Sequence, residues 1–165
     1  MNYTIYISGP ISDPTTGLPR EGWQRIFLDA EAKLRRMGFS VINPVDIARE
    51  VDDAIKWRWG AYGGPCSSIG DPEKPTREDY IMACLQRMKM SHEFHNLHAV
   101  YVIGDSMACY ASHGVKMELL LAEMMKVPIY AESRDDCNVD HNLVLQPGEP
   151  DLQKFTEQCF NLNVH

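Results

Sequence analysis

Two residues of types suited to chemistry, Ser112 and Glu118, lie six positions apart at the start of a helix-forming stretch that continues as an apolar run over 119–122. Ser112 predicts the N-cap of a helix, because its hydroxyl can accept from the free backbone N–H groups of the first turn. At helical spacing, the neighbours of Glu118 carry no charge: Gly114, Val115, Leu121 and Ala122. Burying an ionised carboxylate without a partner is costly. Glu118 is therefore expected either to reach a partner distant in the sequence or to face a cleft where its chemistry is used.

The start of this helix is also a candidate anion site. A serine hydroxyl and free backbone N–H groups at a helix N-terminus together favour negative charge. A plain capping role for Ser112 is the alternative, and the two roles are compatible. The net charge of −7, from 16 basic and 23 acidic side chains, argues against a partner held through a nucleic-acid backbone, which needs a basic face. A small anionic ligand is compatible with this charge.

The first part of the chain predicts the elements of a parallel sheet. Residues 3–7 form a β-rich run that ends at Ser8-Gly9-Pro10. A helix follows, with apolar residues at the 3.6 period from Trp23 to Met37, and then a second strand over 39–42. A strand–helix–strand order implies a crossover connection between parallel strands.

Residues 45–77 have the least regular pattern. A partial helix is expected from Ile47 to Trp59, with glycines and prolines interrupting the remainder. The cluster Trp57-Arg58-Trp59 predicts either a cover over a planar ligand or an anchor to the core. Thr76 and Asp79 then have the spacing of a capping box, which predicts the start of a helix that runs to about Met90.

The remaining apolar runs predict two more strands: one over 99–103, before the helix that carries Glu118 in the sequence, and one over 127–130, after it. The chain is expected to be one domain over 1–165, with a core over 3–131 and a C-terminal extension over 132–165. Its predicted class is α/β: a Rossmann- or flavodoxin-like three-layer sandwich with a four- or five-stranded parallel sheet.

Cysteine usage and hydropathy predict a reducing compartment. The five cysteines are odd in number and lack the spacing of a zinc site, so free thiols are expected. No run reaches the length of a membrane span, and the N-terminal pattern is that of a strand and not of a signal peptide. We therefore expect a cytoplasmic protein without a membrane partner.

Three of these motifs together resemble the nucleoside 2-deoxyribosyltransferase-like superfamily. They are Tyr6-Ile7-Ser8-Gly9-Pro10, Val41-Ile42-Asn43-Pro44 and Ser112-x-Gly114-x-x-x-Glu118, and the resemblance covers about residues 3 to 131. The superfamily includes the transferases and the 2′-deoxynucleoside 5′-phosphate N-hydrolases, and the chain resembles an uncharacterised branch of it most.

The resemblance implies cleavage of the N-glycosidic bond of a 2′-deoxynucleoside or its 5′-monophosphate. Glu118 would be the nucleophile, as in a retaining glycosidase, with the base expelled and the sugar then passed to water or to a second base. A helix dipole would favour its ionised form. The substrate-binding residues implied are Tyr6, Ser8, Gly9, Pro10, Ser112 and Gly114.

The chain departs from the family at three supporting positions, one of which is His98, where relatives usually have an aspartate. Ser12 stands where the hydrolases have an arginine, so a cation for the phosphate would come from Arg20 or Arg58. Cys84 stands where the family has an aspartate on the helix before the third strand, which leaves Asp79 as the acidic candidate for catalysis.

The carboxylate itself supplies the chemistry, so we expect neither a metal nor an organic cofactor. The resemblance also implies a homo-oligomer, a dimer or higher. Two alternatives remain at this point: a non-catalytic nucleotide-binding module on the same fold, and a flavodoxin-like redox or signalling domain. The second would need a phosphate loop after the first strand, for which Ser8-Gly9-Pro10 is poorly suited.

Overall fold

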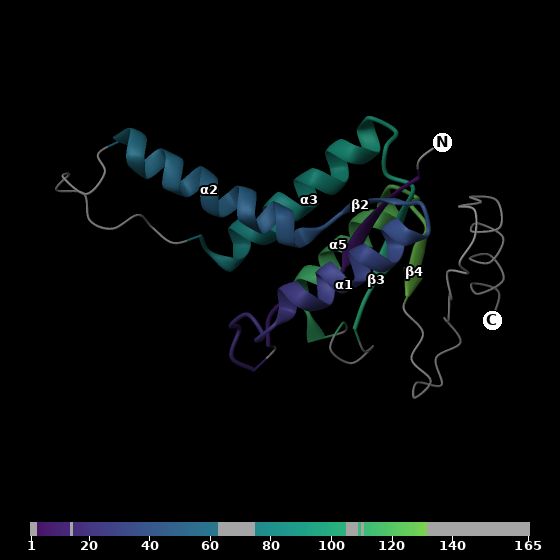
Figure 1. Cartoon of the computed structure of the whole chain (residues 1–165), viewed down its shortest axis with the longest axis horizontal. Coiled ribbons are helices and arrows are strands. Elements are labelled where there is room, and N and C mark those ends of the chain that lie inside the picture. Colours follow the sequence, from purple (N-terminus) through teal and green to yellow (C-terminus); the bar gives the residue numbers. More distant parts are fainter. Residues whose placement is uncertain (1–2, 14, 63–74, 105–108, 110, 132–165) are drawn as a thin grey trace.

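Four parallel strands form one sheet with helices on both faces (Figure 1). The computed structural model describes residues 3–13, 15–62, 75–104, 109 and 111–131, with side chains in the second helix as far as Ile55. Its elements are β1 (Thr4–Ser8), α1 (Trp23–Arg36), β2 (Ser40–Ile42), α2 (Pro44–Tyr62), α3 (Arg77–Glu93), β3 (Ala99–Val102), α5 (His113–Met124) and β4 (Ile129–Ala131). The predicted three-layer α/β class is confirmed, with four strands in the described part of the chain.

The strand order is β2-β1-β3-β4, so β1 lies inside the sheet between β2 and β3. From β1 the chain goes to β2 on one side and later to β3 on the other. Ligands of open parallel sheets bind beyond the carboxyl ends of the strands where the order reverses in this way. The end of β1, at Ser8 and Gly9, is therefore the place where this fold favours a site.

Side-chain alternation along β1 separates two buried clusters. Ile5 and Ile7 point to the α1 face, where they pack with Phe27 and Leu34. Tyr6 points to the opposite face, into a cluster that includes residues of α3 and α5: Cys84, Met88, Val115 and Ala122. Because successive strand residues alternate in direction, Ser8 lies on the same face as Tyr6.

Helix α2 is longer than predicted. It begins at Pro44, a residue well suited to a first helical turn, and the Asn43 side chain accepts from the backbone N–H of Val45 at 3.0 Å. The helix continues through Gly60 to Tyr62, and the run Gly63-Gly64-Pro65 follows it in the sequence. The side chains of Trp57-Arg58-Trp59, residues 63–74 and the extension 132–165 lie outside the described residues.

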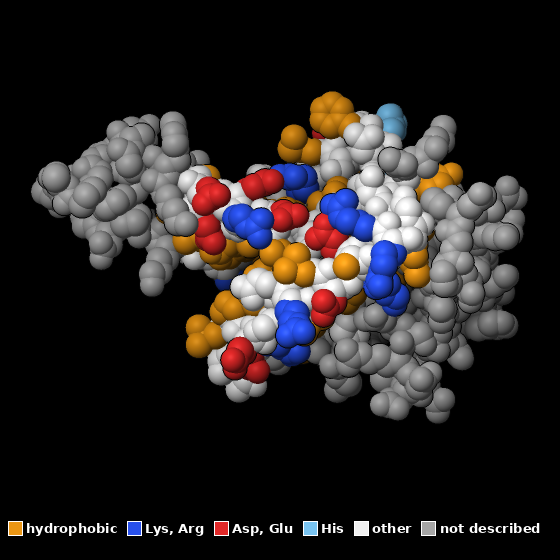
Figure 2. Space-filling model, in the orientation of Figure 1, with side chains coloured by type: hydrophobic (Ala, Val, Ile, Leu, Met, Phe, Trp, Pro, Cys, Tyr) orange, Lys and Arg blue, Asp and Glu red, His pale blue; other side chains and the backbone are white. Residues whose placement is uncertain are grey.

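The surface of the described residues has charges of both signs in the view of Figure 2. Among the described residues, no helix has the length and hydropathy needed to cross a bilayer. On the face drawn in Figure 2, the basic and acidic side chains of the described residues are intermixed, and hydrophobic side chains gather between them.

Candidate active site

The Glu118 carboxylate is held by two hydroxyl groups from β1. The Tyr6 hydroxyl donates to Oε1 at 2.7 Å, and the Ser8 hydroxyl donates to Oε2 at 2.5 Å. Glu118 is 7% exposed, and Tyr6 and Ser8 are fully buried. Tyr6 and Ser8 can both reach it because they are two residues apart on one face of the strand. Glu118 thus has partners distant in sequence, as one of the two expectations required.

Helix α5 begins where the sequence predicts. Ser112 is its N-cap, and the serine hydroxyl accepts from the backbone N–H of Val115 at 3.4 Å. Glu118 is the sixth residue of this helix, beyond the first turn. The favourable effect of a helix dipole is confined to about one turn. The expected contribution of the dipole to ionising Glu118 is therefore replaced by the two hydrogen bonds from β1.

Burial and hydrogen bonding act in opposite directions on Glu118. Burial raises the pKa of its carboxyl to about 7, although the hydrogen bonds from Ser8 and Tyr6 lower it. Burial, and then the nearby Glu118 charge, raise the pKa of the Cys84 thiol to about 12 and that of Tyr6 well above its ordinary value. Tyr6 and Cys84 therefore stay protonated near neutral pH, and Glu118 is the member of this group that titrates there.

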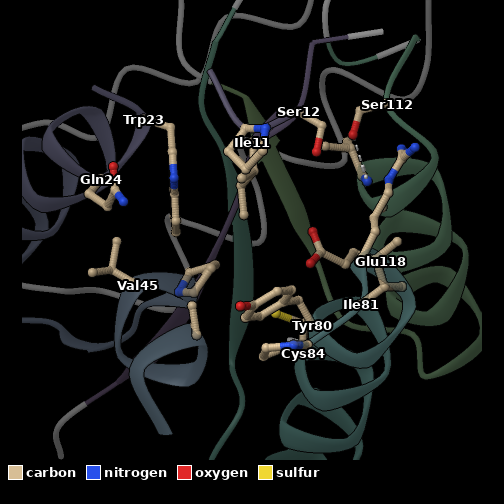
Figure 3. A pocket seen from close by; sticks show the side chains of 18 of the residues that line it. Ile11, Ser12, Trp23, Gln24, Val45, Tyr80, Ile81, Cys84, Ser112 and Glu118 are labelled. Atoms are coloured by element: carbon tan, nitrogen blue, oxygen red, sulfur yellow. Dashed lines mark hydrogen bonds between the residues drawn. The ribbon is translucent and has the colours of Figure 1, made fainter. Parts of the chain in front are cut away.

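Glu118 also lines a cleft of about 660 Å³, a volume suited to a small-molecule ligand. Figure 3 shows Trp23, Gln24 and Val45 on one side of the cleft, with Glu118, Ile81 and Cys84 on the other. The walls thus come from α1 and the start of α2 on one side and from α3 and α5 on the other. The second expectation for Glu118, that it faces a cleft, also holds.

Most of the predicted binding residues lie at this cleft or against its carboxylate. Gly9, Ser112 and Gly114 line it. Tyr6 and Ser8 donate hydrogen bonds to the Glu118 carboxylate from β1. A Cβ on Gly9 would lie 2.7 Å from Cγ1 of Ile103, so a glycine is needed there for the ends of β1 and β3 to pack.

Pro10 and Asp79 are placed elsewhere. Pro10 is absent from the cleft lining and lies against Gly104, whose φ of +98° is in the left-handed region. Asp79 is exposed at the start of α3, where its Oδ2 accepts from the backbone N–H of Thr76 at 2.7 Å and from the Thr76 hydroxyl at 2.9 Å. The predicted capping box is thus confirmed. These hydrogen bonds lower the pKa of Asp79, and the carboxyl does not line the cleft with Glu118.

Two cations and one carboxylate of the cleft are not apparent from the sequence. Arg49 and Asp52 come from α2, and Arg77 comes from the first turn of α3. Arg20, a predicted source of positive charge, is not part of the lining, and the Arg58 side chain lies outside the described residues. Recognising Arg49 and Asp52 would have required placing α2 beside the end of β1, and no local motif in the sequence indicates that.

No group of three or more histidine, cysteine, aspartate or glutamate side chains that could hold a metal ion occurs among the residues described. No family model matches the chain, and no curated protein or solved structure was found to be similar to it.

Proposed function

We propose that the protein cleaves the N-glycosidic bond of a 2′-deoxynucleoside or a 2′-deoxynucleoside 5′-monophosphate through a glutamyl-deoxyribosyl intermediate. The observation that carries the proposal is the Glu118 carboxylate, which is buried, fixed at both oxygens and open to a cleft of ligand size. A carboxylate oriented in this way is the nucleophile that a double displacement at a sugar carbon requires.

In the first step, a Glu118 oxygen attacks the anomeric carbon, and the carbon–nitrogen bond breaks with its electron pair leaving on the base. The product is an ester between Glu118 and the sugar. Water, or a second base, then attacks the same carbon and releases the carboxylate, giving hydrolysis or base transfer. The proton that the attacking group loses balances the one that the departed base takes up. Tyr6 and Ser8 would hold the carboxylate in one orientation throughout, which removes the cost of ordering it during the reaction.

The proposal includes a place for the 5′-phosphate of a nucleotide. Ser112 and the start of α5 line the cleft, as do Arg77 and Arg49. Free N–H groups at a helix start and arginine side chains both bind phosphate oxygens. These groups support a monophosphate substrate, although Ser112 already serves as the N-cap of α5.

A second candidate function is a nucleotide-binding module without catalysis. The favouring observation is that the supporting acid of the family is missing from its place: Cys84 lines the cleft as a protonated thiol, and Asp79 is used in a capping box. Without a proton donor, a base leaves slowly. Both candidates take a small nucleoside or nucleotide as ligand. Assembly as a homo-oligomer, which the resemblance implies, and a cytoplasmic location, which cysteine usage and hydropathy predict, belong to this proposal as well.

The experiment that separates the candidates is release of free base. Purified protein is incubated with a panel of deoxynucleosides and their 5′-monophosphates, and the base is quantified by chromatography. We expect release by the wild type and a loss of at least about a hundredfold in Glu118→Ala, as is usual when a catalytic group is removed. Glu123→Ala is the matched control, because Glu123 is exposed on the same helix.

Three outcomes decide between the candidates. Release that depends on Glu118 supports the enzyme. Binding of a nucleotide without release supports the module, and wild-type turnover by Glu118→Ala contradicts the mechanism. Circular dichroism shows whether Glu118→Ala is folded, and Glu118→Gln, which retains the shape of the side chain, repeats the comparison if it is not.

A further inference from the structure

A second carboxylate of the cleft has no role in the mechanism above. Asp52 of α2 accepts a hydrogen bond at Oδ1 from the hydroxyl of Tyr80 of α3, at 2.7 Å. Both side chains line the same cleft as Glu118. Among the described residues of the lining, Asp52 and Glu118 are the two carboxylates. They occupy different helices, α2 and α5, so the cleft presents negative charge at two separate places.

The hydrogen bond with Tyr80 fixes how Asp52 is presented. Burial, followed by the hydrogen bond to Asp52, raises the pKa of Tyr80 to about 12, so the tyrosine stays protonated and donates a hydrogen bond to Asp52. Within the described part of the chain, Oδ2 of Asp52 accepts no hydrogen bond. A partly buried carboxylate oxygen beside a cleft is an acceptor that favours a ligand carrying N–H donors.

Aromatic and apolar side chains nearby suit a planar ligand. Trp23 lines the cleft, and its ring is fixed by an edge-to-face contact with Phe27, with centroids 5.6 Å apart. Figure 3 shows Trp23 and Tyr80 on separate sides of the cavity, with Glu118 on the side of Tyr80. Bases held out of a helix are usually bound in this way, between apolar or aromatic side chains and with polar groups at the edge of the ring.

We infer that Asp52, held by Tyr80, determines which base the cleft accepts, by taking hydrogen bonds from an amino group on the base. This inference rests on the proposed function, since it concerns the base of that substrate. Guanine, adenine and cytosine carry an exocyclic amino group. Hypoxanthine and uracil lack it and keep only a ring N–H as donor, beside a carbonyl oxygen that a carboxylate oxygen repels. The cleft therefore selects amino-bearing bases.

Two ligand pairs isolate this amino group. 2′-Deoxyguanosine and 2′-deoxyinosine monophosphates differ only in the 2-amino group. The cytidine and uridine counterparts exchange an amino group for a carbonyl and an N3 acceptor for an N3–H donor. Dissociation constants for all four are measured by calorimetry on Glu118→Gln, in which turnover is blocked, with and without Asp52→Asn. We expect the parent to prefer the amino-bearing member of each pair by about tenfold or more, as sites built around a hydrogen bond do.

The Asp52→Asn change should remove that preference, because the amide can turn its own donor to the ligand. Asp53→Asn is the matched control: it makes the same change at the next, exposed position, which does not line the cleft. Tyr80→Phe frees the Asp52 carboxylate to rotate and should reduce the preference by a smaller factor. It carries the test if Asp52→Asn does not fold.

Equal affinities within both pairs would overturn the inference. So would an unchanged preference in Asp52→Asn, or in Tyr80→Phe if Asp52→Asn does not fold. The preference and base release are separate readouts. A preference that depends on Asp52, in a protein that releases no base, supports the inference and contradicts the enzyme. Base release without a preference contradicts the inference alone, and no binding of any of the four contradicts both.

Discussion

Replacing Glu118 with glutamine should remove a large pH dependence of stability. In the folded protein the pKa of Glu118 is raised from 4.5 to about 7, chiefly by burial. The folded state therefore binds a proton at this position between these pH values when the unfolded state has released it. Stability falls as pH rises through this window, since ionisation is disfavoured only in the folded protein. Glutamine has the same shape and does not titrate.

The size of the effect follows from the two pKa values. Each pH unit between 4.5 and about 7 changes the free energy of unfolding by about 1.4 kcal/mol, which gives about 3 kcal/mol in total. Between pH 4 and pH 8, wild type should lose about 3 kcal/mol relative to Glu118→Gln. With a urea m-value of about 2 kcal/mol/M, this corresponds to a relative shift of about 1.5 M in the unfolding midpoint.

Urea unfolding followed by circular dichroism, at half-unit steps from pH 4 to pH 8, measures this shift. Other carboxyl groups and histidines titrate over the same range, but they are common to both proteins and cancel in the difference. Glu123→Gln, an exposed change on the same helix, should stay parallel to wild type. A difference between wild type and Glu118→Gln that stays constant within about 0.5 kcal/mol over the whole range would refute the reasoning about burial.

Four further substitutions test the cleft and the structure that supports it. Ser8→Ala removes a hydrogen bond that lowers the pKa of Glu118, so the pH-dependent loss of stability should extend to higher pH, measured by the same titration. Asp79→Ala should lower the free energy of unfolding, measured in urea, by about 1 kcal/mol, as loss of a cap does, while base release stays at the wild-type rate. A large loss of activity would instead assign Asp79 a role in the reaction. Gly9→Ala should lower the free energy of unfolding by about 1–3 kcal/mol, because its new Cβ would lie 2.7 Å from Ile103. In Gly114→Ala the new Cβ lies 3.7 Å from its nearest neighbour, so this variant should unfold at the wild-type urea concentration or higher. Equal stabilities for the two variants would contradict the packing described.

Local patterns were sufficient for the elements of the fold. The apolar run before Ser8 predicts β1, and the spacing from Ser112 to Glu118 predicts the capped helix that carries the carboxylate. The capping box of Thr76 and Asp79 is likewise a contact within one turn, and it is present as expected. These features depend on residues within a few positions of one another, so the sequence contains what is needed to predict them.

The partners of Glu118 depend on contacts across the whole domain. Tyr6 and Ser8 are 112 and 110 residues away in the chain, and only the pairing of β1 with β3 and the packing of α5 bring them to the carboxylate. Asp52 is harder still to predict, because its significance depends on the position of α2 relative to Tyr80. For Asp79 the sequence allowed both a cap and a catalytic acid, and the structure uses its carboxylate in the cap.

The central claim is that Glu118 becomes covalently attached to the sugar. The most direct measurement is mass spectrometry of protein quenched in acid within milliseconds to seconds of mixing with a deoxynucleoside 5′-monophosphate that releases base. We expect a mass increase equal to deoxyribosyl phosphate on the peptide containing Glu118, absent in Glu118→Gln. Base release at the wild-type rate with no adduct on that peptide, or with the adduct on another residue, would contradict it.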